Sequence, residues 1–62
     1  MKLYIEVIQL SAETYFWFLK DGEKKVASSE KITEREVIIE EAELLTKELK
    51  LLPIVINERK RS

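Results

Sequence analysis

The sequence contains no cysteine and no histidine, and only one glycine and one proline occur among its 62 residues. The missing cysteines exclude disulfide bonds, and the two absences together remove the usual zinc ligands, thiol nucleophiles and imidazole bases. A domain this short buries only about 60% of its unfolded surface, so it usually needs a disulfide, a metal or a partner chain. Because the first two lack their usual ligands, we expect either unusually good local structure or oligomerisation.

No charge of one sign dominates the chain. It has 11 basic and 12 acidic residues and a net charge of −1, so no global attraction to nucleic acid or to an anionic membrane is expected. No stretch is long and apolar enough to span a bilayer, and the first six residues lack the uninterrupted apolar core of a signal peptide. We therefore expect a cytoplasmic protein, with a Glu-, Lys- and Ile-rich composition typical of thermophile surfaces.

Hydrophobic residues make up 45% of the chain and charged residues 37%, a composition typical of a folded domain. Segments rich in β-branched and aromatic residues predict strands over 2–10, 14–20, 24–29 and 54–57. The Asp-Gly pair at 21–22 predicts a tight hairpin between the second and third strands, because both residues tolerate a positive φ. The third strand is the more polar one, so we expect it at a sheet edge.

The segment from Thr33 to about Lys50 has a helical pattern. Thr33 and Glu36 match a capping box, glutamates dominate the first half, and Pro53 is expected to end the helix. One apolar stripe with alternating four- and three-residue spacing predicts the face that packs on the sheet. The stripe comprises Ile38, Ala42, Leu45, Leu49 and Leu52.

These elements predict a single α+β domain over residues 1–58. We expect an antiparallel sheet, the chain order strand–strand–strand–helix–strand, and one amphipathic helix packed on the sheet. Residues 59–62 are expected to form a charged C-terminal tail.

Both faces of the first two predicted strands are apolar, whereas a sheet with one solvated face alternates apolar and polar residues. A single helix is about 10 Å across and four strands lie about 4.8 Å apart, so one helix cannot cover one face, let alone two. We therefore expect a homodimer, with exchange of the C-terminal strand between the chains. A second helical stripe at Val37, Leu44 and Leu51 either meets another helix or widens the core face, and both interpretations stay open. The candidate surface for a second copy or another protein comprises Tyr15, Trp17, Val37, Leu44, Leu51, Ile54 and Ile56.

A further set of motifs runs from the second predicted strand into the helix. These motifs are Trp17-Phe18-Leu19-Lys20, Gly22, Val26-Ala27-Ser28-Ser29-Glu30 and the helix start at Thr33. Together they resemble the YegP-like family of small domains of unknown function, over roughly residues 3–38. The resemblance implies a three-strand–helix–strand motif, found as tandem repeats or as homodimers that form one sheet and swap C-terminal strands.

The chain also departs from that family's pattern. Its turn is shorter, Ile32 stands where the family usually has Tyr, and Glu41-Ala42 stands where the family has a mid-helix Gly-Ile pair. The last difference changes how closely helix and sheet approach. Since the family has no established activity, the resemblance bears on fold and dimer rather than on function.

No motif in the sequence predicts an active site. Ser28-Ser29-Glu30 places hydroxyls beside a carboxylate, but no imidazole exists to take a proton, so a turn or cap is the better interpretation. The helical glutamates face several directions, which is typical of a solvated surface. Asp21 is the single aspartate and no phosphate-binding glycine loop occurs, so neither a calcium loop nor a nucleotide site is indicated. We expect no catalytic residue, no metal and no cofactor.

Two functions remain for such a chain. The first is a small non-enzymatic homodimeric interaction module, which follows from two apolar strand faces without chemistry. The second is a weak single-stranded nucleic-acid binder, in which sheet aromatics stack on bases and basic residues contact phosphates. Aromatics that fill the core or the dimer seam are the simpler interpretation, because a short chain needs their bulk. The candidate nucleic-acid contacts are Phe16, Phe18, Lys20, Lys24, Lys25, Arg59, Lys60 and Arg61.

Overall fold

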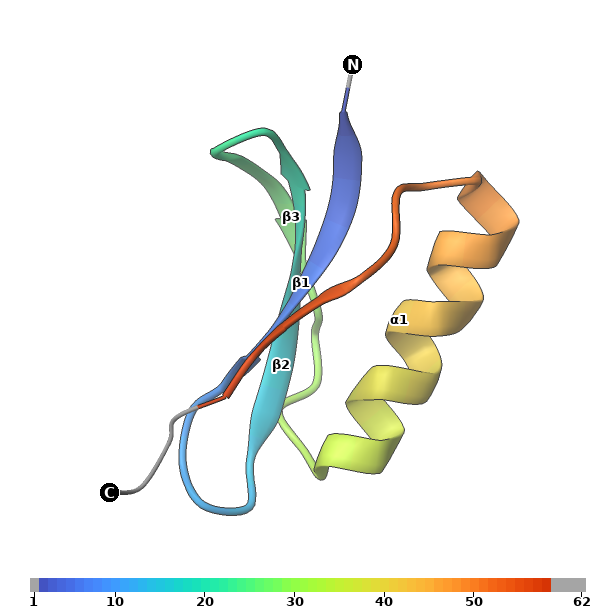
Figure 1. The fold of residues 1–62 in the computed structure, drawn as a ribbon. Helices are drawn as coiled ribbons and strands as arrows, with labels where there is room; N and C mark the ends of the chain where they lie inside the picture. Colours follow the sequence, from blue (N-terminus) through green and yellow to red (C-terminus); the bar gives the residue numbers. More distant parts are fainter. Residues whose placement is uncertain (1, 59–62) are drawn as a thin grey trace.

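The computed structural model describes residues 2–58 and shows a four-stranded sheet with one helix on one of its faces (Figure 1). The α+β class and the predicted chain order are confirmed. The elements are β1 (Leu3–Gln9), β2 (Tyr15–Asp21), β3 (Lys24–Ser28), α1 (Arg35–Leu49) and β4 (Val55–Asn57). The predicted charged tail at 59–62 lies outside the described residues.

The sheet has the strand order β3-β2-β1-β4 and is mixed. β1 pairs antiparallel with β2 and β2 antiparallel with β3, but β4 pairs parallel with β1, so the prediction of a purely antiparallel sheet is wrong. The reason is the helix. A strand–helix–strand connection carries the chain back to the end where it started, so β4 runs in the same direction as β3 and therefore as β1.

The β2–β3 connection is a two-residue hairpin, since Asp21 pairs with Lys24 across Gly22 and Glu23. Gly22 has a φ of 64° at the first loop position, a conformation that suits glycine because it has no Cβ. The predicted hairpin is confirmed, with its loop one residue later than the Asp-Gly pair. The pairing then skips Val26, because Leu19 faces Ala27 while Lys20 faces Lys25, and this bulge twists the edge strand.

The helix begins one residue later than the capping box predicts. Glu34 is the N-cap and makes no side-chain cap hydrogen bond. Thr33 instead belongs to the sheet: its amide donates to the Tyr15 carbonyl at 3.1 Å, and the Tyr15 amide donates to the Thr33 carbonyl at 2.7 Å. The Thr33 amide therefore already donates across the sheet and is not free to donate to the Glu36 carboxylate as a reciprocal cap, so the capping-box prediction is wrong.

The helix also ends before Pro53. Lys50 adopts the left-handed conformation with a φ of 53°, and the amide of Leu51 donates to the Thr46 carbonyl at 2.9 Å. Leu52 then donates its amide to the Leu3 carbonyl at 3.0 Å, which ties the connection to β1. Leu51 and Leu52 therefore lie beyond the helix, and both predicted helical stripes are too long at this end.

The core lies between α1 and the two central strands. Among the described residues, the buried apolar side chains are Ile5, Val7, Tyr15, Ile38 and Ala42. α1 packs on β1 and β2 and makes no such contact with β3 or β4 in the described part of the chain. Half-buried side chains surround this centre: Trp17, Leu19, Ile39, Leu45, Leu51 and Ile54. The helix thus leaves two surfaces uncovered, the far face of the sheet and a strip beside β3.

Candidate interaction surfaces

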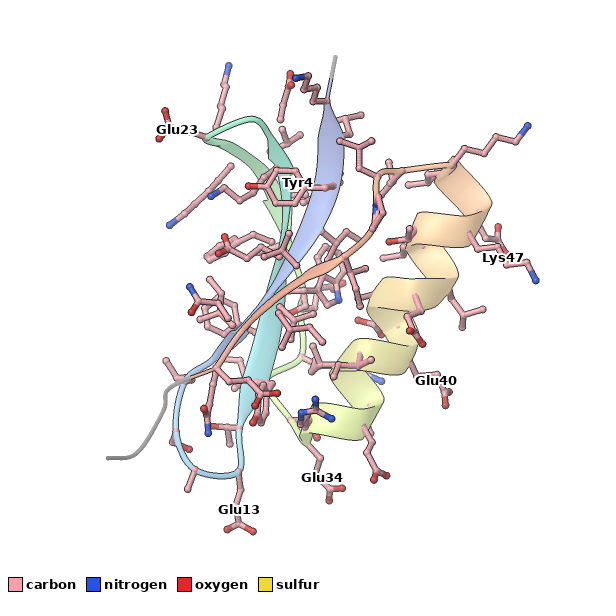
Figure 2. The ribbon with its side chains drawn as sticks, viewed as in Figure 1. Tyr4, Glu13, Glu23, Glu34, Glu40 and Lys47 are labelled. Atoms are coloured by element: carbon pink, nitrogen blue, oxygen red, sulfur yellow. The ribbon has the colours of Figure 1, made fainter. Side chains whose placement is uncertain are left out.

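The first surface is the face of the sheet away from α1, which we call the open face. Strand alternation puts Ile5 and Val7 under the helix, so Tyr4, Glu6 and Ile8 point the other way. Within residues 2–58, Figure 1 shows no element over this side of the sheet, and Figure 2 shows Tyr4 on it. The open face comprises Tyr4, Glu6, Ile8, Phe16, Phe18, Lys20, Lys25, Val55 and Asn57.

Aromatic rings form the apolar part of the open face. Phe16 and Phe18 meet edge to face with their ring centroids 4.9 Å apart. The Lys25 ammonium lies 4.3 Å from the centroid of the Phe18 ring, within the range of a cation–π contact. Ile8 lies opposite Phe16 on the neighbouring strand. All but Lys25 are half-buried in the single chain, so a substantial apolar area faces outward.

An ion pair occupies the middle of the open face. The Lys20 Nζ lies 3.2 Å from the Glu6 Oε1, and both side chains are only 16% exposed. The other Glu6 oxygen accepts a hydrogen bond from the Asn57 Nδ2 at 3.4 Å. Hydrogen bonding to the Glu6 carboxylate raises the pKa of the Lys20 ammonium. Since both carboxylate oxygens have partners, Glu6 is poorly placed to act as a general base.

The second surface is a groove of about 650 Å³ between α1 and β3. It exists because α1 lies over β1 and β2 and leaves the β3 side uncovered. The Trp17 indole lines the groove, and its Nε1 donates a hydrogen bond of 2.7 Å to the Glu41 Oε1 on the helix. We call it the Trp17 groove; it is lined by Trp17, Ser28, Glu30, Lys31, Glu41, Leu44, Leu45 and Glu48.

Backbone contacts hold the strand side of the Trp17 groove in place. The Ser29 amide donates to the Trp17 carbonyl at 2.9 Å, and the Trp17 amide donates to the Ser29 Oγ at 3.2 Å. The Ser29 hydroxyl in turn donates to the Lys31 carbonyl at 2.9 Å. The serine pair at the end of β3 is therefore turn structure, as its sequence context indicates, and the segment after β3 is a formed wall.

The residues predicted as a dimer or partner surface do not form one patch. Tyr15 is only 5% exposed and belongs to the core, so it cannot be a contact surface. Leu51 lies beyond the helix and, like Ile54, packs against the core. Trp17 and Leu44 line the groove, whereas Val37 on the helix and Ile56 on β4 are exposed elsewhere, at 44% and 39%.

The predicted nucleic-acid contacts are brought together only in part. Phe16, Phe18, Lys20 and Lys25 share the open face. Lys24 pairs with Asp21 and so points to the helix side of the sheet. The predicted contacts Arg59, Lys60 and Arg61 lie outside the described residues.

Sequence reasoning did not single out the Tyr4–Glu6–Ile8 side of β1 as a surface shared with Phe16 and Phe18. Its signal is the alternation along β1, which assigns these three residues to one face. The contact between Glu6 and Asn57 has no such signal, because it depends on the parallel pairing of β4 with β1.

Within residues 2–58, no cluster of acidic side chains could hold a metal ion, and no helix is long and apolar enough to cross a membrane. Comparison of the chain with protein-family models finds no match, and comparisons with curated proteins and with solved structures find none either. The resemblance to YegP-like domains therefore stays a prediction.

Proposed function

We propose that this chain is a non-enzymatic interaction module that functions as a homodimer, with the open faces of two copies packed together. The observation that carries the proposal is the row of Tyr4, Ile8, Phe16 and Phe18 on a sheet face that no described element covers. The same proposal includes a cytoplasmic location and the exchange of β4 between copies. In the single chain β4 pairs with its own β1 through three residues, which is little pairing to break.

The size of the open face sets the expected affinity. Strands of up to seven residues, four abreast, give a face of roughly 400 Å². Two such faces bury roughly 800 Å² in total, which is below the ~1,200 Å² of a standard specific interface. We therefore expect the open face alone to give a dissociation constant in the micromolar range or weaker. This corresponds to a binding free energy of about −8 kcal/mol or weaker.

The charges of the open face are compatible with burial. Glu6 and Lys20 neutralise each other at 3.2 Å, so packing a second copy over them buries a formed pair instead of a lone charge. Lys25 stands over the Phe18 ring on the edge strand β3, where its ammonium can remain hydrated. The aromatic rings are the part of this face whose composition matches the core of an interface, since aromatic residues are enriched there.

Sedimentation equilibrium over a range of about 1 μM to 1 mM tests the proposal. We expect the wild type to dimerise, Phe16→Lys to remain a monomer, and Glu40→Gln to dimerise like the wild type. The last two variants change the net charge equally, and Glu40 projects from the helix away from the sheet (Figure 2). Ile8→Thr, which keeps a β-branched residue opposite Phe16, is the milder second variant if Phe16→Lys fails to fold. A wild type that stays monomeric throughout, or folded open-face variants that dimerise unchanged, would overturn the proposal.

Single-stranded nucleic-acid binding is the second candidate, because Phe16 and Phe18 lie on the open face with Lys20 and Lys25 instead of in the core. Glu6 counts against it, since its carboxylate lies at the centre of that face and occupies Lys20. Trp17 points to the helix side and cannot report on stacking at the open face. Fluorescence anisotropy of a labelled single-stranded oligonucleotide at low salt is the appropriate measurement. Binding that weakens with salt and with Phe18→Ala supports this candidate, and no binding rejects it.

A further inference from the structure

Part of the lining of the Trp17 groove is apolar. It consists of Trp17, Leu44 and Leu45. Leu44 is 56% exposed, and the other two side chains are only half-buried. The groove lies on the helix side of the sheet, so a second copy packed on the open face does not cover it. This apolar surface therefore stays available to another molecule whether or not the chain dimerises.

The charged part of the lining is acidic. Glu30, Glu41 and Glu48 contribute three carboxylates, against the single ammonium of Lys31. Among residues 2–58, the Glu30 and Glu48 carboxylates have no hydrogen-bond or ion-pair partner, whereas Glu41 accepts a hydrogen bond from the Trp17 indole. In that part of the chain the carboxylates do not converge on a metal-binding point either. The groove thus presents two unpaired negative charges beside an apolar surface.

This combination favours side chains with a cationic head and an aliphatic stem. A guanidinium or ammonium group forms charge-assisted hydrogen bonds with carboxylates and a cation–π contact with an indole. Its methylene stem covers apolar surface at the same time. A purely apolar segment would desolvate the carboxylates without pairing them, which costs free energy. Arginine suits the groove best, because its planar head both stacks on aromatic rings and pairs with carboxylates.

Charge argues against the helix of a second copy as the occupant of the groove. The exposed surface of α1 carries Glu36, Glu40 and Glu43 in addition to the glutamates that line the groove. A second α1 laid in the groove would bring carboxylates of the two copies together, and like charges that face each other across an interface are costly. The groove is instead complementary to a basic segment of another protein.

The spacing of the carboxylates sets the length of that segment. Glu41 and Glu48 are seven residues apart on α1, which corresponds to about 10 Å along the helix axis. Three extended residues span about the same distance. We propose that the Trp17 groove binds a short basic segment of another protein, about three residues long and rich in arginine. The proposal does not depend on the dimer proposed above, because the groove and the open face lie on opposite sides of the sheet.

Titration with an acetyl- and amide-capped triarginine peptide at low salt tests the proposal. Trp17 is the single tryptophan, so its emission and the NMR resonance of its indole N–H report on the groove directly. We expect saturable changes in both, with a dissociation constant of about 0.1–1 mM, because exposed ion pairs are individually weak. Capped tricitrulline is the matched probe, since it keeps the stems and the planar heads without the charge. It should bind at least about tenfold more weakly.

Two charge-matched variants locate the contact. E30Q/E48Q removes the two unpaired carboxylates and leaves Glu41 on the indole. E13Q/E23Q changes the net charge equally, but Glu13 and Glu23 project from the turns and lie outside the groove (Figure 2). We expect E30Q/E48Q to raise the dissociation constant for triarginine at least about fivefold, and E13Q/E23Q to bind within about twofold of the wild type. All four substituted residues are exposed, so both variants should fold.

The proposal is wrong if neither Trp17 signal changes up to about 10 mM triarginine at low salt. Equal binding of tricitrulline, or equal weakening in the two variants, would also reject it, because the charge of the groove would then play no part. If the indole resonance of Phe16→Lys shifts with protein concentration in the absence of peptide, a second copy occupies the groove instead.

The same measurements keep the two proposals apart. A wild type that stays monomeric and binds triarginine supports the groove contact and overturns only the open-face dimer. A wild type that dimerises but does not bind the peptide does the reverse.

Discussion

The two faces of the sheet come from the same strands but are built differently. On the helix side, Ile5 and Val7 are fully buried under Ile38, and the described residues place no charged side chain in that core. On the open face, half-buried aromatic rings surround the Glu6–Lys20 pair. One face, the closed face, is covered by the chain's own helix, and no described element covers the other.

The difference shows what a polar group does to an apolar face. A charged pair inside the closed core would have to be fully desolvated, which often costs as much as the pairing returns. At 16% exposure the Glu6–Lys20 pair keeps some contact with water while apolar neighbours shield most of it. Such a face tolerates water in the monomer, and in the proposed dimer a partner would cover a formed pair instead of a lone charge.

The largest expected effect is on the closed face. Ile38 is fully buried, so Ile38→Ala should lower the free energy of unfolding by about 2–5 kcal/mol, because it removes apolar contacts and leaves a cavity. For a domain of this size that loss is comparable to the whole stability, and we expect the variant to be largely unfolded. Circular dichroism with urea titration measures the change.

Val37→Ala on the same helix is the matched control. Val37 is 44% exposed, so its truncation should cost at most about 1 kcal/mol and leave the fold intact. Equal losses for the two variants would show that α1 packs through a different face from the one described.

The next effect is at the edge of the closed face, where the Trp17 indole donates to Glu41 at 2.7 Å. Trp17→Phe removes this charge-assisted hydrogen bond and part of the ring, and should cost about 1–2 kcal/mol in a half-exposed position. A double-mutant cycle with Glu41→Ala isolates the hydrogen bond. A coupling energy near zero would mean that the indole and the carboxylate contribute independently.

A smaller stability effect is expected on the open face. Phe18→Ala removes the edge-to-face contact with Phe16 and the Lys25 contact, together about 1 kcal/mol in the dilute monomer. The same change should weaken self-association strongly, because Phe18 is part of the proposed contact. A loss of 3 kcal/mol or more at low concentration would place Phe18 in a core instead, and would remove the contrast between the faces.

Much of the fold could be predicted because it depends on local pattern. The alternation in β1 and β2, the Gly22 turn and the Ile38–Ala42 spacing each specify an element without reference to the rest of the chain. The direction of β4 depends on where the helix returns the chain, which is not local. The predicted start of the helix was wrong for the same reason. The Thr33 amide donates its hydrogen bond to the Tyr15 carbonyl across the sheet, a contact that the local sequence does not reveal.

The candidate surfaces could be predicted only in fragments. Phe16, Phe18 and Lys20 are two residues apart along one strand, so they share one face of it, and the sequence shows this directly. The Trp17 groove has no sequence signal, because it arises from α1 crossing β1 and β2 but not β3. Leu44 was part of a predicted stripe, yet its exposure beside Trp17 follows from that crossing and not from its spacing.

The smallest effect concerns the ion pair that distinguishes the open face. Hydrogen bonding to Glu6 raises the pKa of Lys20 in the folded chain above its ordinary value of 10.5. A group whose pKa is raised by folding contributes stability that is fully present below the unfolded pKa and is lost as the pH rises through the folded pKa. The unfolding free energy should therefore fall slightly above about pH 10.5 in the wild type, and this fall should be smaller in Glu6→Gln.

An NMR titration of the Lys20 Cε resonance measures the shift directly. We expect Glu6→Gln to lower the Lys20 pKa in dilute monomer, because the paired carboxylate is the main cause of the shift. In dilute solution the Lys20 pKa of Glu6→Gln could equal that of the wild type, with a difference only at concentrations where the chain associates. The ion pair would then form in the dimer and not in the single chain. The open face of the free monomer would then present a free lysine and a free carboxylate, and its resemblance to a preformed interface would be lost.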